Sequence, residues 1–202
     1  MKDKDNRKEL LKDIRDEVVR LKSSPLYAFR IESKNYPVIG EGNHYTDIMF
    51  VGEAPGRNEA KTGKPFCGAA GKILDELLDS VKIKRDDVYV TNIVKDRPPK
   101  NRDPIPEEIE VYAPFLDRQI EIIKPRIIAT LGRFSMKYIM ERFGLTSLLG
   151  LIGEMHGKHF ETDMSYGKVV IVPLYHPAVA VYNSNTKDTL KEDFKILTKL
   201  LK

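Results

Sequence analysis

The sequence predicts an α/β fold in which a parallel sheet is covered by helices on both faces. Four short apolar runs rich in β-branched residues, typical of buried strands, alternate with segments of helical periodicity. This alternation is typical of doubly wound sheets, and a length of 202 residues suits one domain. The predicted strands are residues 47–52, 87–92, 126–132 and 168–176.

Helices are predicted before and between these strands. An apolar stripe predicts an amphipathic helix over residues 6–22. We expect residues 1–36 to form a helical segment that packs on a single domain spanning residues 1–202. Pro106 followed by two glutamates is typical of a helix start. Further helices are predicted over residues 69–80, 106–123 and 133–142.

Composition limits the classes of function. The chain is 41% hydrophobic and 32% charged, as in soluble globular proteins, and no run approaches the ~18 apolar residues of a membrane span. We therefore expect no membrane contact, and the charged N-terminus without a signal sequence favours the cytoplasm. A net charge of +4 permits nucleic-acid binding without establishing it. A single cysteine, Cys67, excludes an intramolecular disulfide and an all-cysteine metal site within one chain.

Polar residues follow each of the four predicted strands. In chain order they are Glu53, Asn92, Arg133 and His176. Because the carboxyl ends of parallel strands meet at one edge of a sheet, where ligands bind, we expect these four side chains to converge. A carboxylate, an amide, a cation and an imidazole would then share one site.

The residue types alone leave structural roles open at this edge. Glu53 could brace its Gly-Pro loop, Asn92 could form a turn, and a histidine before proline is often structural. Phe66 could be a stacking platform for a ring or a core residue. The loop 51–68 lacks both the G-x-G-x-x-G spacing and the Lys-Ser/Thr of phosphate loops, so we expect no nucleotide cofactor.

Four ordered motifs resemble the uracil-DNA glycosylase superfamily, specifically the family-four type of bacteria and archaea. They are GEAPGRNEAKTGKPFCGAAGKILDELL, VYVTNIVKDRPPKNRDPIPEEI, FLDRQIEIIKPRIIATLGR and VPLYHPA, between about Gly40 and Asp193. The resemblance implies a three-layer α/β/α sandwich with a central four-stranded parallel sheet. It also implies a DNA repair enzyme that flips uracil out of DNA and hydrolyses its N-glycosidic bond, leaving an abasic site.

The resemblance assigns roles to individual residues. Glu53 and His176 match the catalytic positions of the first and last motifs. Phe66 matches the aromatic residue that stacks on the extruded base, and Asn92 matches the amide that reads its edge. Gly52 and Glu59, in the same loop as Glu53, are expected to contribute to substrate binding.

Two segments are expected to contact DNA around this site. The basic stretch RPPKNR (97–102) can neutralise phosphates, and AVAVYNSN (178–185) occupies the place of the loop that wedges into the duplex. The DNA-binding residues implied in this way are Arg97, Lys100, Arg102, Arg133, Val181 and Tyr182.

The chain departs from the family at the four cysteines that hold an iron–sulfur cluster. Their positions here are Leu21, Ser24, Asp96 and Tyr112. We therefore expect no metal and no cofactor. Ordinary packing is expected to replace the cluster, with Leu21 meeting Tyr112 and with Asp96 either pairing with a nearby lysine or arginine or capping the loop.

Two alternatives remain beside uracil excision from single- or double-stranded DNA by a monomer. The chain could prefer another deaminated base, such as hypoxanthine or xanthine. It could also be a non-catalytic DNA-binding relative, although Glu53, Asn92 and His176 together argue against this.

Overall fold

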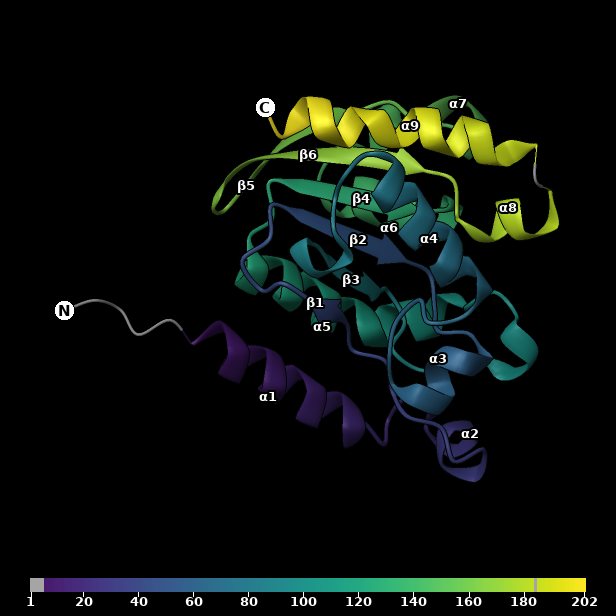
Figure 1. Ribbon diagram of the computed structural model, residues 1–202. Helices are drawn as coiled ribbons and strands as arrows, with labels where there is room; N and C mark the ends of the chain where they lie inside the picture. Colours follow the sequence, from purple (N-terminus) through teal and green to yellow (C-terminus); the bar gives the residue numbers. More distant parts are fainter. Residues whose placement is uncertain (1–5, 184) are drawn as a thin grey trace.

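The centre of the molecule is a six-stranded mixed sheet (Figure 1). The computed structural model describes residues 6–183 and 185–202. The strand order is β1-β3-β2-β4-β6-β5. The strands are β1 (Glu41–Gly42), β2 (Ile48–Gly52), β3 (Tyr89–Asn92), β4 (Ile127–Leu131), β5 (Phe160–Met164) and β6 (Gly167–Leu174).

The four predicted strands form the parallel centre of this sheet. Strand β2 pairs in parallel with β3 and β4, and β4 pairs in parallel with β6, so the predicted four-stranded core is confirmed. Two short edge strands were not predicted, and both pair antiparallel with their neighbours. In the register, Gly52 is opposite Asn92 and Leu131 is opposite Leu174, so the carboxyl ends of the four parallel strands lie level.

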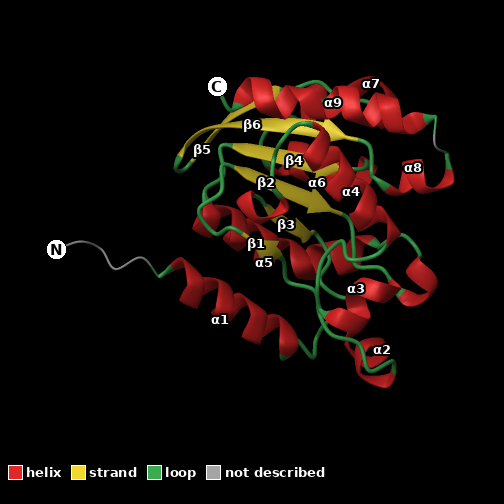
Figure 2. Cartoon of the chain, viewed as in Figure 1, coloured by secondary structure: helices red, strands yellow, loops and turns green. Residues whose placement is uncertain are grey.

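Helices enclose the sheet (Figure 2). The predicted helices over 69–80, 106–123 and 133–142 are confirmed, whereas the N-terminal helix ends three residues earlier than predicted. Within residues 6–183 and 185–202, every helix is too short or too polar to cross a membrane. The helices are α1 (Arg7–Val19), α2 (Tyr27–Glu32), α3 (Arg57–Thr62), α4 (Ala69–Ser80), α5 (Pro106–Ile123), α6 (Arg133–Arg142), α7 (Ile152–Met155), α8 (Ala178–Tyr182) and α9 (Thr186–Leu200).

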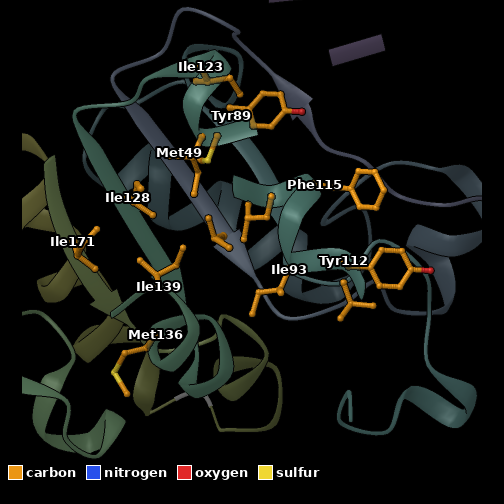
Figure 3. Packing of buried hydrophobic residues seen from close by; sticks show 14 of the residues in the cluster. Met49, Tyr89, Ile93, Tyr112, Phe115, Ile123, Ile128, Met136, Ile139 and Ile171 are labelled. Carbon is orange, nitrogen blue, oxygen red and sulfur yellow. The ribbon is translucent and has the colours of Figure 1, made fainter. Parts of the chain in front are cut away.

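Alternating side chains of the strands build two separate hydrophobic cores. Met49 and Val51 of β2 point to the face covered by α1, α5 and α6. Ile48 and Phe50 point to the opposite face, where they pack with α4 and α9. Figure 3 shows the first core, with strand residues such as Ile128 packed beside side chains of α5 and α6. The sheet therefore lies between two helical layers, as the resemblance implies.

Candidate active site

A cavity of about 330 Å³ opens at the carboxyl edge of the parallel strands. Its walls come from the loop after β2, the end of β3, the segment 98–102 and the residues after β6. The sequence-predicted residues that line it are Glu53, Glu59, Phe66, Asn92, Arg102 and His176. Four segments that are distant in the chain therefore converge at one site.

Asn92 ends β3 and places its amide in this cavity. The residue is 2% exposed, and its Oδ1 atom is buried without a hydrogen-bond partner. Gly52, on the adjacent strand, makes room for the amide: a Cβ atom there would lie 2.3 Å from Oδ1 and 2.8 Å from the Phe66 ring. A buried acceptor without a partner in the chain is costly in a folded protein, and because Asn92 lines the cavity, a molecule bound there can supply that partner.

Phe66 forms one wall of the cavity and is also a core residue. Its backbone adopts a left-handed φ of 49°, uncommon for a residue other than glycine. Gly71 of α4 fits beneath this turn, because a Cβ atom at Gly71 would lie 1.7 Å from the Phe66 carbonyl oxygen. The ring centroids of Phe66 and His176 lie 5.6 Å apart with an interplanar angle of 30°. The unusual turn therefore fixes an aromatic surface beside the imidazole.

His176 follows β6 and is held in one tautomer. Its Nδ1 atom lies 3.2 Å from the backbone nitrogen of Ala178, which can only donate, so the ring proton is on Nε2. Burial lowers the pKa of His176 to about 4, although the charge of Glu59 opposes the shift. The imidazole is therefore a neutral hydrogen-bond donor at physiological pH.

Glu53 follows β2 and is a half-buried carboxyl group. Among the described residues, no side chain or backbone group forms a hydrogen bond with its carboxylate. Burial and then the charge of Asp103 raise the pKa of Glu53 to about 7, and Arg133 acts in the opposite direction. A carboxyl group poised near neutrality in a cleft is typical of proton-transfer or charge-stabilising sites.

Glu59 has the loop-bracing role that the sequence left open for Glu53. Its Oε1 atom accepts hydrogen bonds from the backbone nitrogens of Cys67, at 3.0 Å, and Gly68, at 2.8 Å. These bonds connect α3 to the start of α4 and hold the segment that carries Phe66. Glu59 lines the cavity, but one of its oxygens is engaged by the protein itself.

Basic side chains surround the entrance, and several already have partners. Arg102 forms two hydrogen bonds with Glu108, at 2.6 and 2.9 Å, and Arg133 donates to Asp103 at 2.5 Å. Arg97 donates to Asn101 at 2.6 Å, and Lys100 is exposed. The sequence analysis missed one cation here: Arg57 lies near enough to Arg97 to lower its pKa further, after the effect of burial.

Exposed apolar residues of α8 lie beside the cavity. Val179 and Val181 are 36% and 41% exposed, and Ala178 at the start of the helix lines the cavity. The side chain of Tyr182, also expected to contact DNA, lies outside the described part of the chain.

The positions that correspond to the cluster cysteines form a buried hydrogen-bond network. The Tyr112 hydroxyl group donates to Asp96 at 2.5 Å and lies 2.7 Å from the Ser24 hydroxyl group. Tyr112 has no solvent exposure, and it belongs to the same hydrophobic cluster that Leu21 packs against. Leu21 and Tyr112 therefore share one hydrophobic cluster as expected, and the hydrogen bonds that join Ser24, Asp96 and Tyr112 are an addition that the sequence analysis did not foresee.

Arg30 of α2 completes this network, and the sequence analysis did not identify it. Its guanidinium contacts both oxygens of Asp96, at 2.9 and 3.2 Å, and donates to the carbonyl groups of Val18 and Val19, at 3.0 and 2.6 Å. Both members of this ion pair are nearly inaccessible to solvent, 4% and 1% exposed. The pairing predicted for Asp96 is confirmed, but it is buried rather than superficial.

These residues do not fit an iron–sulfur cluster. Such clusters are held by thiolates, whereas the four positions carry an alkyl group, two hydroxyl groups and a carboxylate. The polar atoms among them are already bonded to one another or to Arg30. The Sγ atom of Cys67, the one cysteine, lies 3.3 Å from the Thr62 hydroxyl group, and Cys67 is not among these four positions. Within the described ranges, no group of three or more His, Cys, Asp or Glu side chains is placed to hold a metal ion.

Comparisons with known proteins agree with this geometry. A family model described as the uracil DNA glycosylase superfamily matches residues 39–199. The Type-4 uracil-DNA glycosylase of Sulfurisphaera tokodaii is 46% identical over 191 residues, which cover 94% of this chain and 84% of that protein. Proteins of the same description are similar in Saccharolobus solfataricus (45% identical, 90% and 82% covered) and Archaeoglobus fulgidus (42% identical, 95% and 94% covered).

Proposed function

Because the chain belongs to the uracil DNA glycosylase superfamily, we propose that it hydrolyses the N-glycosidic bond of uracil in DNA and leaves an abasic site. A base inside a duplex is inaccessible, so the nucleotide must rotate out of the stack into the cavity at the edge of the sheet. The flipped base would lie on the Phe66 ring, beside His176 and Asn92.

The unpartnered amide of Asn92 is the observation that carries this proposal. Uracil presents an N3–H donor beside the O4 acceptor, which match the buried Oδ1 atom and the Nδ2 donor of this amide. Cytosine presents the opposite order and would leave buried polar groups unpaired. Such mismatches allow discrimination of about 10⁴-fold or more in sites built for hydrogen bonding. Asn92 therefore favours uracil.

Hydrolysis requires charge to be stabilised on both sides of the breaking bond. The bond pair passes to N1 of uracil, the sugar gains oxocarbenium character at C1′, and a water oxygen then bonds C1′. Ionised Glu53 would stabilise the cationic sugar or orient the water and accept its proton. Either role needs the carboxylate form, so the raised pKa of about 7 places the acidic limb of activity near neutrality.

His176 would act on the leaving base. Its neutral ring offers an Nε2–H donor to the uracil O2 atom, where negative charge develops as the bond breaks. Removing one such donor typically costs about 10²–10³-fold in rate. A neutral donor is suited to this task because it needs no proton transfer to stabilise the anion.

DNA would contact the rim of the cavity. Lys100 is exposed, and Arg97 and Arg57 are close enough to affect one another, so this part of the rim can neutralise phosphates. Val181 is exposed on α8, which begins at the cavity, and would enter the space that the flipped nucleotide leaves. Arg102 is paired with Glu108, and Arg133 is paired with Asp103. Each arginine would have to leave its carboxylate to bind a phosphate, which makes its contribution to DNA affinity smaller.

The direct test offers the protein one lesion at a time. Single-stranded oligonucleotides that carry uracil, hypoxanthine or xanthine at one position are incubated with the protein and then treated with alkali, which cleaves abasic sites. We expect strand cleavage from the uracil oligonucleotide and none from a control with cytosine in its place. Folded protein that yields no abasic product from uracil would refute the proposal, and product mainly from hypoxanthine or xanthine would reassign the substrate.

We further infer that the enzyme works as a monomer in the cytoplasm. Every residue of the proposed site comes from one chain, so a single copy can form the complete cavity. Sedimentation of the free protein and of its complex with a short uracil oligonucleotide would test the first part. Two protein copies bound to one lesion would contradict it.

A further inference from the structure

Lys95 is a buried cation directly behind the residue that faces the base. Its side chain has no solvent exposure. Its Nζ atom donates to the backbone oxygen of Asn92 and to Oε1 of Gln119, both at 2.6 Å, and to Oγ1 of Thr91 at 2.8 Å. The amine is therefore one hydrogen bond away from the backbone of Asn92, on the inner side of the cavity wall.

The hydrogen bonds around Lys95 require its ammonium form. Gln119 donates through Nε2 to the Ile39 carbonyl group at 2.9 Å, which turns its Oε1 atom toward Lys95. The shortest contact of the Thr91 hydroxyl group is with the same carbonyl group, at 2.6 Å, against 3.3 and 3.5 Å for its other acceptors, so Thr91 donates there and accepts from Nζ. Three acceptors need three N–H donors, which a neutral amine does not have. Burial lowers the pKa of Lys95 well below its ordinary value, whereas the three acceptors around Nζ favour the protonated form.

This charge has no anionic partner in the part of the chain that the structure describes. None of the ion pairs of the described residues includes Lys95. The carboxylate of Asp96, the next residue, is engaged by Arg30 and Tyr112. An unpaired buried charge is costly, and an apolar side chain of similar volume would serve packing better. The cost is explained if the charge acts on a negative group that occupies the cavity.

We propose that Lys95 is a positioning residue for the reaction, which holds Asn92 against the flipped base and stabilises, through its charge, the uracil anion that departs. This inference rests on the proposed function. The electron pair of the glycosidic bond moves onto the uracil ring, next to the Asn92 amide, and the positive charge behind that amide favours this movement. Asn92 contacts the base, whereas Lys95 acts through Asn92 and through space.

The test compares uracil with 5-fluorouracil as the leaving base. Fluorine withdraws electrons, so the 5-fluorouracil anion is more stable and depends less on a nearby cation. We expect Lys95→Met to slow single-turnover release of uracil by roughly 30-fold, the effect that one charge has at a separation of ~8 Å in a medium of effective dielectric constant ~20. Release of 5-fluorouracil should slow less, so the ratio of the two rates should rise severalfold.

Two further variants separate charge from structure. Gln119→Glu keeps an oxygen beside Nζ but places a carboxylate there, which cancels the charge without removing the lysine, although it also removes the Nε2 donor to the Ile39 carbonyl group. Gln119→Glu should also raise the ratio of 5-fluorouracil release to uracil release. It tests the role of the charge if Lys95→Met does not fold. Arg30→Met removes another buried cation, remote from the cavity lining, and should leave the ratio unchanged while lowering stability.

The outcomes distinguish this inference from the proposed function. If the folded variants Lys95→Met or Gln119→Glu keep the ratio of the unaltered protein, the lysine only fills the core and the inference is wrong. An equal rise in Arg30→Met would contradict it as well, because the effect would then follow stability. If the unaltered protein releases neither base, the proposed function itself fails.

Discussion

Two buried polar centres lie on either side of the segment 92–96, and they differ in how completely their atoms are paired. On one side, the Oδ1 atom of Asn92 has no hydrogen-bond partner and Glu53 has a pKa raised to about 7. On the other side, Asp96 is bonded to Tyr112 and to Arg30, which also binds two backbone carbonyl groups. The first centre has a polar atom that the chain itself leaves unpaired, whereas the second is paired within the chain.

This difference distinguishes residues that act on a substrate from residues that stabilise the fold, and it can be seen without comparison to related proteins. A satisfied network fixes the chain around it, and here it connects α1, α2, the segment after β3 and α5. A centre with an unpaired polar atom slightly destabilises the free protein, and it favours binding of a ligand that supplies the missing hydrogen bond. Mutations in the first centre should therefore affect catalysis, and mutations in the second should affect stability.

The largest effect is expected from Glu53→Gln. Loss of the carboxylate should slow uracil release by about 10²–10⁴-fold, the usual contribution of a positioned acid or base. The free energy of unfolding should instead increase at alkaline pH. Because the folded state raises the pKa of Glu53, it binds a proton that the unfolded chain releases, and stability is lost as pH rises from about 4.5 to about 7. The variant should therefore be more stable than its parent at pH 8 and equal to it at pH 4.

Urea unfolding at the two pH values and single-turnover kinetics measure both quantities. A variant that is less stable at pH 8 would show that Glu53 braces its loop, the structural role left open by the sequence. A rate near that of the parent would show that Glu53 is not catalytic.

The next largest effect is expected from Asp96→Ala in the satisfied centre. Removal of one member of a buried ion pair leaves Arg30 as an uncompensated charge and should cost about 3–5 kcal/mol of unfolding free energy. Glu17→Ala is the matched control, since Glu17 also connects α1 with α5, through Arg118, but both side chains are exposed. It should cost about 1 kcal/mol or less.

Uracil release by Asp96→Ala, measured below its melting temperature, should match that of the parent. A loss of release without a loss of stability would mean that the network acts on the cavity rather than on the fold. Equal destabilisation by Asp96→Ala and Glu17→Ala would show that burial of the pair adds nothing.

The smallest effect is expected from Asp103→Asn at the entrance. The charge of Asp103 helps to raise the pKa of Glu53, so its removal should shift the acidic limb of activity to lower pH. Asp103 is exposed, and the shift should be only a few tenths of a pH unit because solvent screens such charges. Asp163→Asn, which removes another exposed and paired carboxylate, should leave the pH profile unchanged. A shift toward higher pH in Asp103→Asn would contradict this account of Glu53.

The sequence predicted the parallel core and its functional edge because buried parallel strands are continuous apolar runs. The same rule missed β5, whose half-exposed FETDM has no such run, and β1, which has two residues. Glu53, Asn92 and His176 were predicted to converge because each lies at or just after the carboxyl end of a parallel strand. Their placement in one cavity required only topology.

Lys95 and Arg30 could not be predicted in the same way. Each looks like an ordinary surface cation in the sequence, and each is buried because of partners far along the chain. Gln119 lies 24 residues from Lys95, and Asp96 lies 66 residues from Arg30. The hydrogen bonds that join Tyr112 to Ser24 and Asp96 were missed for this reason, because they depend on tertiary contacts, which leave no local pattern.

The most direct test of the contrast between the two centres is the single-turnover rate of uracil release by Asn92→Leu, measured beside the parent at equal fractions of folded protein. Leucine has a similar size but cannot bond the uracil edge. Because the Oδ1 atom has no partner in the free protein, its loss should leave the free energy of unfolding unchanged or slightly higher. We predict a rate at least about 100-fold below that of the parent, since the polar edge of the base would be buried unpaired. A variant that releases uracil within a few-fold of the parent rate would contradict the assignment of the unsatisfied amide to the base.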